Sequence, residues 1–214
     1  WMGNGAVSLR GRSEALIRLA RETWGPEITL YVDGNGSYDH GEAIRIGRIL
    51  EEYDYAWFEE PCPFEQYGET RAAADALNIP VAGGEQDCNL GMFRSMIENR
   101  VVDVIQPDLM YNGGLIRALR VAVMAKEADI PIVPHSPKHN PELATLVHFA
   151  SVVEHTGPFL EYPAVDVEHG DWYRPAFTLS PGGTVDVPAG PGLGIAYDEA
   201  IWTDAETMLD LRAP

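Results

Sequence analysis

Acidic and imidazole side chains recur along this chain at a nearly constant spacing, each at the end of a short apolar run. They are Asp33, Glu59, Glu85, Asp108, His135 and Glu161, and successive members are 26, 26, 23, 27 and 26 residues apart. Carboxylates and imidazoles can bind a metal ion or transfer a proton near neutral pH. One acid at the end of such a run needs no function, because a loop begins there. A regular series of them indicates a shared site.

The apolar runs that carry these residues have the composition of β-strands buried on both faces. They cover residues 28–35, 55–61, 79–85, 101–108, 130–136 and 158–163. Between some of them, apolar residues recur at the spacing of one helix face, as in Leu115, Ala118, Leu119 and Ala122. This alternation predicts an α/β fold with a parallel sheet, in which all strands end at the same edge.

The shared site favours a closed sheet over an open one. Neighbouring strands lie about 4.8 Å apart, so the first and sixth strand ends of an open sheet would be roughly 24 Å apart. That distance is too large for one reaction site, whereas a closed barrel brings all strand ends to one mouth. We therefore predict a TIM-like (β/α) barrel with six strands visible, rather than a doubly wound sheet. A full barrel of this type has eight strands, so we expect the first two to lie upstream of Trp1.

Three acids at consecutive strand ends predict a magnesium site. Asp33, Glu59 and Glu85 would supply hard oxygen ligands, and water and substrate would complete the octahedral shell that Mg2+ requires. Glu60, next to Glu59, is expected to support the site. The alternative is that these acids are solvated strand caps or partners of helix dipoles. Asn35 is predicted to bind substrate, although an Asn in a Gly-rich turn is equally explained by its tolerance of left-handed backbone.

Composition and charge narrow the classes of partner. A formal net charge of -18 repels nucleic acid and anionic membrane surfaces, and it favours divalent cations. No apolar stretch approaches the roughly 20 residues that span a bilayer. Cys62 and Cys88 are too few for a disulfide scaffold, so we expect a cytoplasmic protein.

Six short motifs occur in a fixed order: "VDGN", "WFEEP", "GGEQ", "QPDLMYNGG", "PHSP" and "LEYP". Over residues 28–163, this series resembles the enolase superfamily, specifically its mandelate racemase-like branch of acid-sugar dehydratases and racemases. The resemblance implies that the visible strands are strands 3–8 of the family's modified barrel. It also implies that the N-terminal capping domain, the first two strands and a lysine-bearing motif on the second strand are absent from this sequence. Residues 1–163 would then be the barrel portion, and residues 164–214 a turn-rich extension that packs back on the barrel or on the capping domain.

The resemblance assigns a role to each residue of the series. It implies that Asp33, Glu59 and Glu85 bind Mg2+, while His135 and Asp108 form a catalytic dyad that moves a proton alpha to a carboxylate. A carboxylate beside an imidazole fixes the tautomer of the ring and favours its protonated form. Glu161 matches the family's electrophile, which in its protonated form would donate a hydrogen bond to the substrate carboxylate.

Several reactions are compatible with these roles. We expect dehydration of an acid sugar to a 2-keto-3-deoxy acid, with racemisation or epimerisation of a 2-hydroxy acid as the alternative. The muconate-lactonizing and dipeptide-epimerase branch is disfavoured because residues 101–111 contain no lysine. A non-catalytic metal-binding fragment and a metal-dependent aldolase are the hypotheses from other classes. The expected partners are a small carboxylate substrate and further copies of the same chain in a homo-oligomer.

Overall fold

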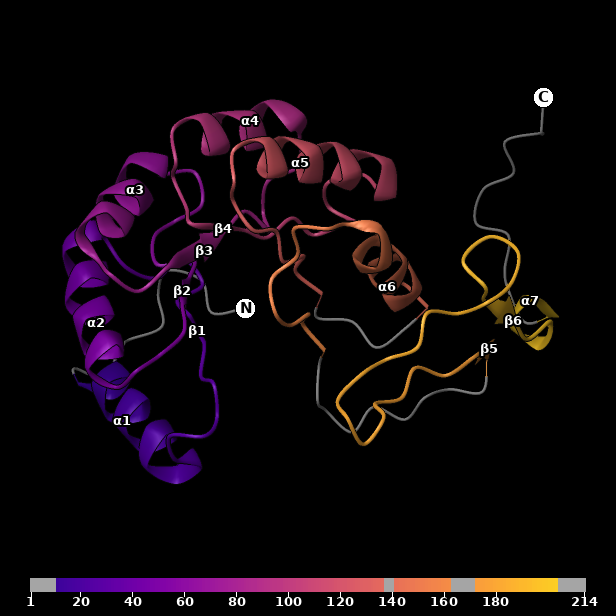
Figure 1. The fold of residues 1–214 in the computed structure, drawn as a ribbon, viewed down its shortest axis with the longest axis horizontal. Helices are drawn as coiled ribbons and strands as arrows, with labels where there is room; N and C mark the ends of the chain where they lie inside the picture. Colours follow the sequence, from indigo (N-terminus) through magenta and orange to yellow (C-terminus); the bar gives the residue numbers. More distant parts are fainter. Residues whose placement is uncertain (1–10, 137–140, 163–171, 204–214) are drawn as a thin grey trace. The chain divides into compact units, whose positions relative to one another are not determined.

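The computed structural model describes residues 11–136, 141–162 and 172–203 (Figure 1). The chain divides into two compact units. The sheet unit comprises residues up to 135 together with residues 155–160, and the C-terminal unit comprises residues 136–154 and those from 161 onward. The predicted domain boundary between residues 163 and 164 lies outside the described residues and stays a prediction.

The sheet unit contains a parallel sheet whose strands follow one another in sequence order. Its strands are β1 (Val32–Asp33), β2 (Phe58–Glu59), β3 (Val81–Gly83) and β4 (Val104–Ile105). Two parallel bridges continue the series, from Ile105 to Ile132 and from Ile132 to Thr156. The strand order never reverses, which is the pattern of a barrel and not of a doubly wound sheet. The α/β parallel fold is therefore confirmed, but the described residues do not close the barrel.

The fifth and sixth predicted strands are shorter than the sequence indicated. Each is a single bridge, at Ile132 and at Thr156, and the second bridge precedes the predicted run 158–163. Pro131 and Pro134 flank Ile132, and a proline has no backbone N–H to donate to a strand ladder. Among the described residues, only four of the six predicted strands form regular ladders, so the prediction is wrong in the extent of the last two.

Five helices of the sheet unit lie along one side of the strands, where they form an arc (Figure 1). They are α1 (Arg12–Trp24), α2 (His40–Glu52), α3 (Tyr67–Ala76), α4 (Leu90–Glu98) and α5 (Leu115–Glu127). Two of them begin with side-chain caps: Asp39 accepts a hydrogen bond from the backbone of Glu42, and Asn89 accepts two from the first turn of α4. These caps fix where the loops after β1 and β3 end.

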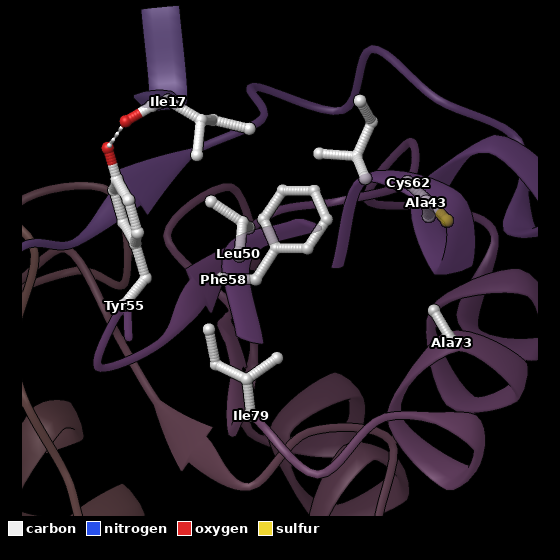
Figure 2. Packing of buried hydrophobic residues seen from close by; sticks show 9 residues of the cluster. Ile17, Ala43, Leu50, Tyr55, Phe58, Cys62, Ala73 and Ile79 are labelled. Atoms are coloured by element: carbon white, nitrogen blue, oxygen red, sulfur yellow. Dashed lines mark hydrogen bonds between the residues drawn. The ribbon is translucent and has the colours of Figure 1, made fainter. Parts of the chain in front are cut away.

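The hydrophobic core between helices and sheet is centred on Phe58 of β2, which is fully buried (Figure 2). Leu50 of α2 and Ile17 of α1 belong to the same cluster. The hydroxyl of Tyr55 donates a hydrogen bond of 3.0 Å to the backbone oxygen of Ile17, which satisfies a buried polar group inside this core. The outward face of β2 is therefore occupied by packing.

Trp57, the residue before Phe58, contributes to a different cluster. It packs against Ala82, Val104 and Val133. Because successive side chains of a strand point to opposite faces, Glu59 shares the face of Trp57 and not that of Phe58. The carboxylate of Glu59 therefore belongs to the face of the sheet opposite the helices.

The C-terminal unit has its own small core. Its elements are α6 (Leu143–Val152), the antiparallel pair β5 (Tyr173–Arg174) and β6 (Ala196–Tyr197), and α7 (Ala200–Thr203). Leu143 and Leu146 of α6 belong to one buried cluster with Tyr173 and Phe177. In the described parts of both units, no helix is long and apolar enough to cross a membrane.

Candidate active site at the carboxyl ends of the strands

Two of the predicted metal ligands are direct neighbours across the sheet. Asp33 of β1 is paired with Glu59 of β2, and Glu59 is in turn paired with Ala82 of β3. Paired residues in adjacent strands present their side chains on the same face. The structure thus brings these two carboxylates together at the carboxyl ends of β1 and β2, as predicted from their spacing.

Glu60 turns the chain sharply at the end of β2. Its φ is 37°, which is unusual for a non-glycine residue, and the residue is only 8% exposed. The loop after β1 crosses close to it, because Gly36 donates a backbone hydrogen bond of 2.7 Å to the oxygen of Glu60. A Cβ on Gly34 would lie 2.8 Å from that same oxygen, so this position has no room for a side chain. The turn lets both acids of "WFEEP" enter the same site.

The surroundings of Glu60 change its pKa. Burial, followed by the negative charges of Glu85, Asp33 and Glu59, raises the pKa of Glu60 to about 8, and His135 opposes the rise. The raised pKa favours the protonated form of Glu60. The sequence predicts only a supporting role for this residue. The feature of the sequence that pointed to Glu60 is the pair of consecutive acids, Glu59 and Glu60. Side chains of a strand alternate between its two faces, so a regular strand would place only one of these acids in the site.

Glu85 lies beside the imidazole of His135. The preceding Gly84 has a φ of 116°, which suits glycine and ends the alternation of β3. Glu85 is 6% exposed, its Oε1 accepts a hydrogen bond of 3.0 Å from the amide of Gln86, and its Oε2 is 3.4 Å from Nε2 of His135. The third predicted ligand thus adjoins the predicted base.

Asp108 holds His135 with one oxygen and its own loop with the other. Its Oδ2 is 3.0 Å from Nδ1 of His135, and its Oδ1 accepts backbone hydrogen bonds from Met110 and Tyr111, at 2.7 and 2.9 Å. Asp108 is only 2% exposed, so this carboxylate is fixed by both sets of contacts. The ring of Tyr111 flanks the imidazole, with ring centroids 6.5 Å apart. The arrangement orients the imidazole and leaves its Nε2 to face the acids.

Asn35 contacts a predicted ligand directly. Its backbone N–H and its side-chain amide donate to the two oxygens of Asp33, at 2.7 and 2.5 Å. Its φ of 45° also agrees with the alternative interpretation, a left-handed turn residue. Binding of substrate by Asn35 stays a prediction.

Glu161 belongs to the C-terminal unit, unlike the other residues of the series. Its carboxylate accepts a hydrogen bond from the backbone N–H of Ser136, which belongs to the same unit. Its predicted role as the electrophile stays a prediction.

The acids have the chemistry of a magnesium site, but their side chains are not arranged as one. Among the described residues, no three His, Cys, Asp or Glu side chains are grouped so that they could hold a metal ion. Both oxygens of Asp33 instead accept hydrogen bonds from Asn35, and Oε1 of Glu85 accepts one from Gln86. Yet the buried Oε1 of Glu60 has no hydrogen-bond partner in the described part of the chain. Clustered carboxylates with an unsatisfied buried oxygen fit a hard divalent cation, after rotation of the hydrogen-bonded side chains.

Comparison with known proteins places this chain in a family. The family model for enolase C-terminal domain-like proteins matches residues 6–201. The chain is 29% identical over 203 residues to an arabinonate dehydratase of Saccharolobus solfataricus, covering 94% of this chain and 53% of that protein. It is 32% identical over 201 residues to a D-galactarolactone cycloisomerase of Agrobacterium fabrum, covering 88% of this chain and 52% of that protein.

Solved structures give the same assignment. A mandelate racemase/muconate lactonizing protein from Paracoccus denitrificans superimposes with a TM-score of 0.84 at 29% identity, over 94% of this chain and 54% of that one. An enolase from Bradyrhizobium, complexed with magnesium and mandelic acid, has a TM-score of 0.76 at 32% identity, over 91% of this chain and 51% of that one. This chain spans about half the length of these relatives. It belongs to the enolase C-terminal domain-like family, which confirms the resemblance carried by its six motifs.

Proposed function

We propose that the protein containing this chain dehydrates an acid sugar to a 2-keto-3-deoxy acid. The observation that carries the proposal is the contact set of His135, whose Nδ1 is held by Asp108 while its Nε2 lies beside Glu85. An imidazole fixed in this way can accept and return a proton next to a metal site. Similarity to an arabinonate dehydratase supports the choice of substrate class.

Asp33, Glu59 and Glu85 would hold Mg2+ in this scheme. When bound, the ion supplies positive charge that stabilises the negative charge developing on the substrate carboxylate. The Bradyrhizobium neighbour, with its magnesium and mandelic acid, supports this assignment. Glu60 would support the site, where its Oε1 is buried without a hydrogen-bond partner among the described residues.

The proposed reaction needs one proton transfer in each direction. His135 takes the C2 proton on Nε2, and Asp108 stabilises the resulting imidazolium through Nδ1. The electron pair of the broken C–H bond forms the enediolate, and Glu161 would donate a hydrogen bond to it. The C3–O bond then breaks, the oxygen leaves as water with the proton from His135, and the enol product tautomerises to the 2-keto-3-deoxy acid.

The test is a substrate screen on the protein at its full natural length. With Mg2+ and a library of aldonic and aldaric acids, at least one substrate should give a product that forms a semicarbazone, and a chelator should abolish its formation. Exchange of the C2 proton for solvent deuterium without loss of a hydroxyl would assign racemisation or epimerisation instead. Enolisation of pyruvate would favour the aldolase hypothesis. No exchange and no product on any acid would contradict the proposed activity and favour a non-catalytic role.

A further inference from the structure

The loop that carries Glu85 contains a buried carboxylate that the proposed reaction does not use. Asp87 is 0% exposed, and neither of its side-chain oxygens has a hydrogen-bond partner in the described residues. Burial of an unpaired carboxylate is unfavourable, so a group of this kind requires a specific explanation. A tight turn fixes the backbone there, with the Asp87 N–H donating to the oxygen of Gly84 at 3.2 Å.

Tyr67 provides a matching donor. It is the first residue of α3, and its hydroxyl is likewise buried without a hydrogen-bond partner among the residues that the structure describes. The parallel pairing of β2 with β3 puts the start of α3 and the loop after β3 at the same edge of the sheet. A buried donor and a buried acceptor therefore lie in neighbouring loops.

The side chains of Tyr67 and Asp87 interact electrostatically, so the two groups are close to each other. The groups do not meet at hydrogen-bonding geometry in this structure. A rotation of the Tyr67 side chain, or one bridging water, would join them.

The loop that carries Glu85 is also connected by hydrogen bonds to the loop that begins with Asp108. Nη1 of Arg117, in the first turn of α5, donates to the backbone oxygen of Cys88 at 3.4 Å and to that of Asn112 at 3.5 Å. Asn112 lies in the loop that begins with Asp108, and its backbone N–H donates to the backbone oxygen of Asp108 at 2.9 Å. Hydrogen bonds through Arg117 therefore connect the Glu85 loop with the Asp108 loop.

We propose that Tyr67 and Asp87 form a positioning pair: the hydroxyl donates to the carboxylate, directly or through one water, and fixes the Glu85 loop relative to β2. This contact would fix the distance between Glu85 and Glu59, which is a residue of β2. The inference rests on the proposed magnesium site, because that distance matters only if both acids bind the same ion.

The test uses Tyr67→Phe, Asp87→Asn and the double variant in the protein at its full natural length. Calorimetric titration gives the Kd for Mg2+, steady-state kinetics separate kcat from KM, and thermal melting reports stability. Each single variant should weaken Mg2+ binding about tenfold, which is the scale of lost support behind metal ligands. The double variant should be no weaker than the weaker single one, because two residues that act through one contact are not additive.

Two control variants remove similar groups elsewhere in the sheet unit. Tyr55→Phe deletes a buried hydroxyl that donates to Ile17 in the helical core. Asp103→Asn alters a carboxylate that accepts from the backbone of Val81, at the opposite end of β3. Both should lower the melting temperature and leave the Kd for Mg2+ unchanged.

The outcomes separate the pair from the site on which it depends. If wild-type protein binds Mg2+ and both Tyr67→Phe and Asp87→Asn bind it with a Kd within about twofold of wild type, the positioning role of the pair is contradicted and the magnesium site stands. Additive losses in the double variant would also overturn it. If wild-type protein binds no Mg2+, the proposed site fails, and the pair's role fails with it.

Discussion

Acidic side chains at the two ends of the parallel strands are used in opposite ways. At the amino end of β3, Glu51 accepts backbone hydrogen bonds from Asn78 and Ile79, at 2.5 and 3.2 Å. At the carboxyl ends, burial and the neighbouring negative charges of Glu85, Asp33 and Glu59 raise the pKa of Glu60 to about 8. The first arrangement satisfies the carboxylate of Glu51, whereas the second leaves Oε1 of Glu60 buried without a partner in the described residues.

This difference between the two strand ends indicates which acids stabilise the fold and which belong to a functional site. Burial alone would raise the pKa of Glu51, but hydrogen bonds from Arg48, Asn78 and Ile79 together outweigh it and lower the pKa. Such a carboxylate contributes to folding in its charged form. A cluster that raises a pKa opposes folding at neutral pH, and clusters of this kind occur where a ligand or a reaction compensates for the cost. The following variants test this distinction.

The largest effect is expected at the imidazole. His135→Asn should lower kcat by about 10²–10⁴-fold, the usual contribution of a positioned acid or base, because Nε2 is the atom that moves the proton. The Kd for Mg2+ should stay within about threefold of wild type, since the ring is not a ligand. Steady-state kinetics and calorimetric titration check both values. Full turnover by this variant on every substrate would mean that the dyad is misassigned.

Asp108→Asn should have a smaller effect. The variant keeps an oxygen for the backbone N–H groups of Met110 and Tyr111, but it faces His135 with an uncharged amide and no longer stabilises the imidazolium. We expect kcat to fall about 10–100-fold, as for other residues that orient a functional group. The pH profile of kcat should also shift, which a purely structural defect would not cause. An unchanged profile with normal kcat would contradict the assigned contact.

Gly34→Ala tests whether the carboxyl-end loops are closely packed. The added Cβ would lie 2.8 Å from the oxygen of Glu60 and 3.1 Å from the ring of Phe58. Overpacking of this kind typically costs about 1–3 kcal/mol. Denaturant unfolding should show the loss, and Gly68→Ala is the control, because its Cβ would meet nothing within 4 Å. Equal stability of the two variants would show that this crossing is loose.

Glu51→Gln, at the amino end, should have the smallest effect and a characteristic pH dependence. The folded-state pKa of Glu51 is lowered, so its charged form stabilises the protein above the ordinary pKa of glutamate. That contribution is lost as the pH falls through the lowered pKa. The variant should therefore be about 0.5–1.5 kcal/mol less stable than wild type at neutral pH, and the two should converge in acid. Denaturant melts across pH 2–7 measure the difference, and a gap that grows in acid would have the wrong sign.

The motif order and strand order could be predicted because both follow from local patterns. Asp33 and Glu59 were expected to meet, since parallel strands end at one edge, and their direct pairing follows from that rule. The contact of His135 with Asp108 agrees with their succession in the series. These are properties of spacing, which the sequence displays directly.

Other features depend on backbone geometry that spacing does not encode. The left-handed turn at Glu60, which admits a second acid, is set by the crossing loop around Gly34. Prolines beside Ile132 reduced a predicted strand to one bridge. In α5, the buried residues extend further toward the C-terminus than the predicted stripe, and Leu115 and Leu119 are only partly buried. The buried residues of α5 are Ala118, Val121, Ala122 and Ala125.

The contrast between the two strand ends is tested most directly by Mg2+ titration of a matched pair of charge-removing variants. Glu59→Gln removes a carboxylate at the carboxyl end, and Glu51→Gln removes one at the amino end, with the same change in net charge. We predict that Glu59→Gln weakens Mg2+ binding at least about tenfold, while Glu51→Gln binds Mg2+ as wild type does. Equal affinity of Glu59→Gln and wild type would contradict the assignment of the magnesium site to the carboxyl ends of the strands.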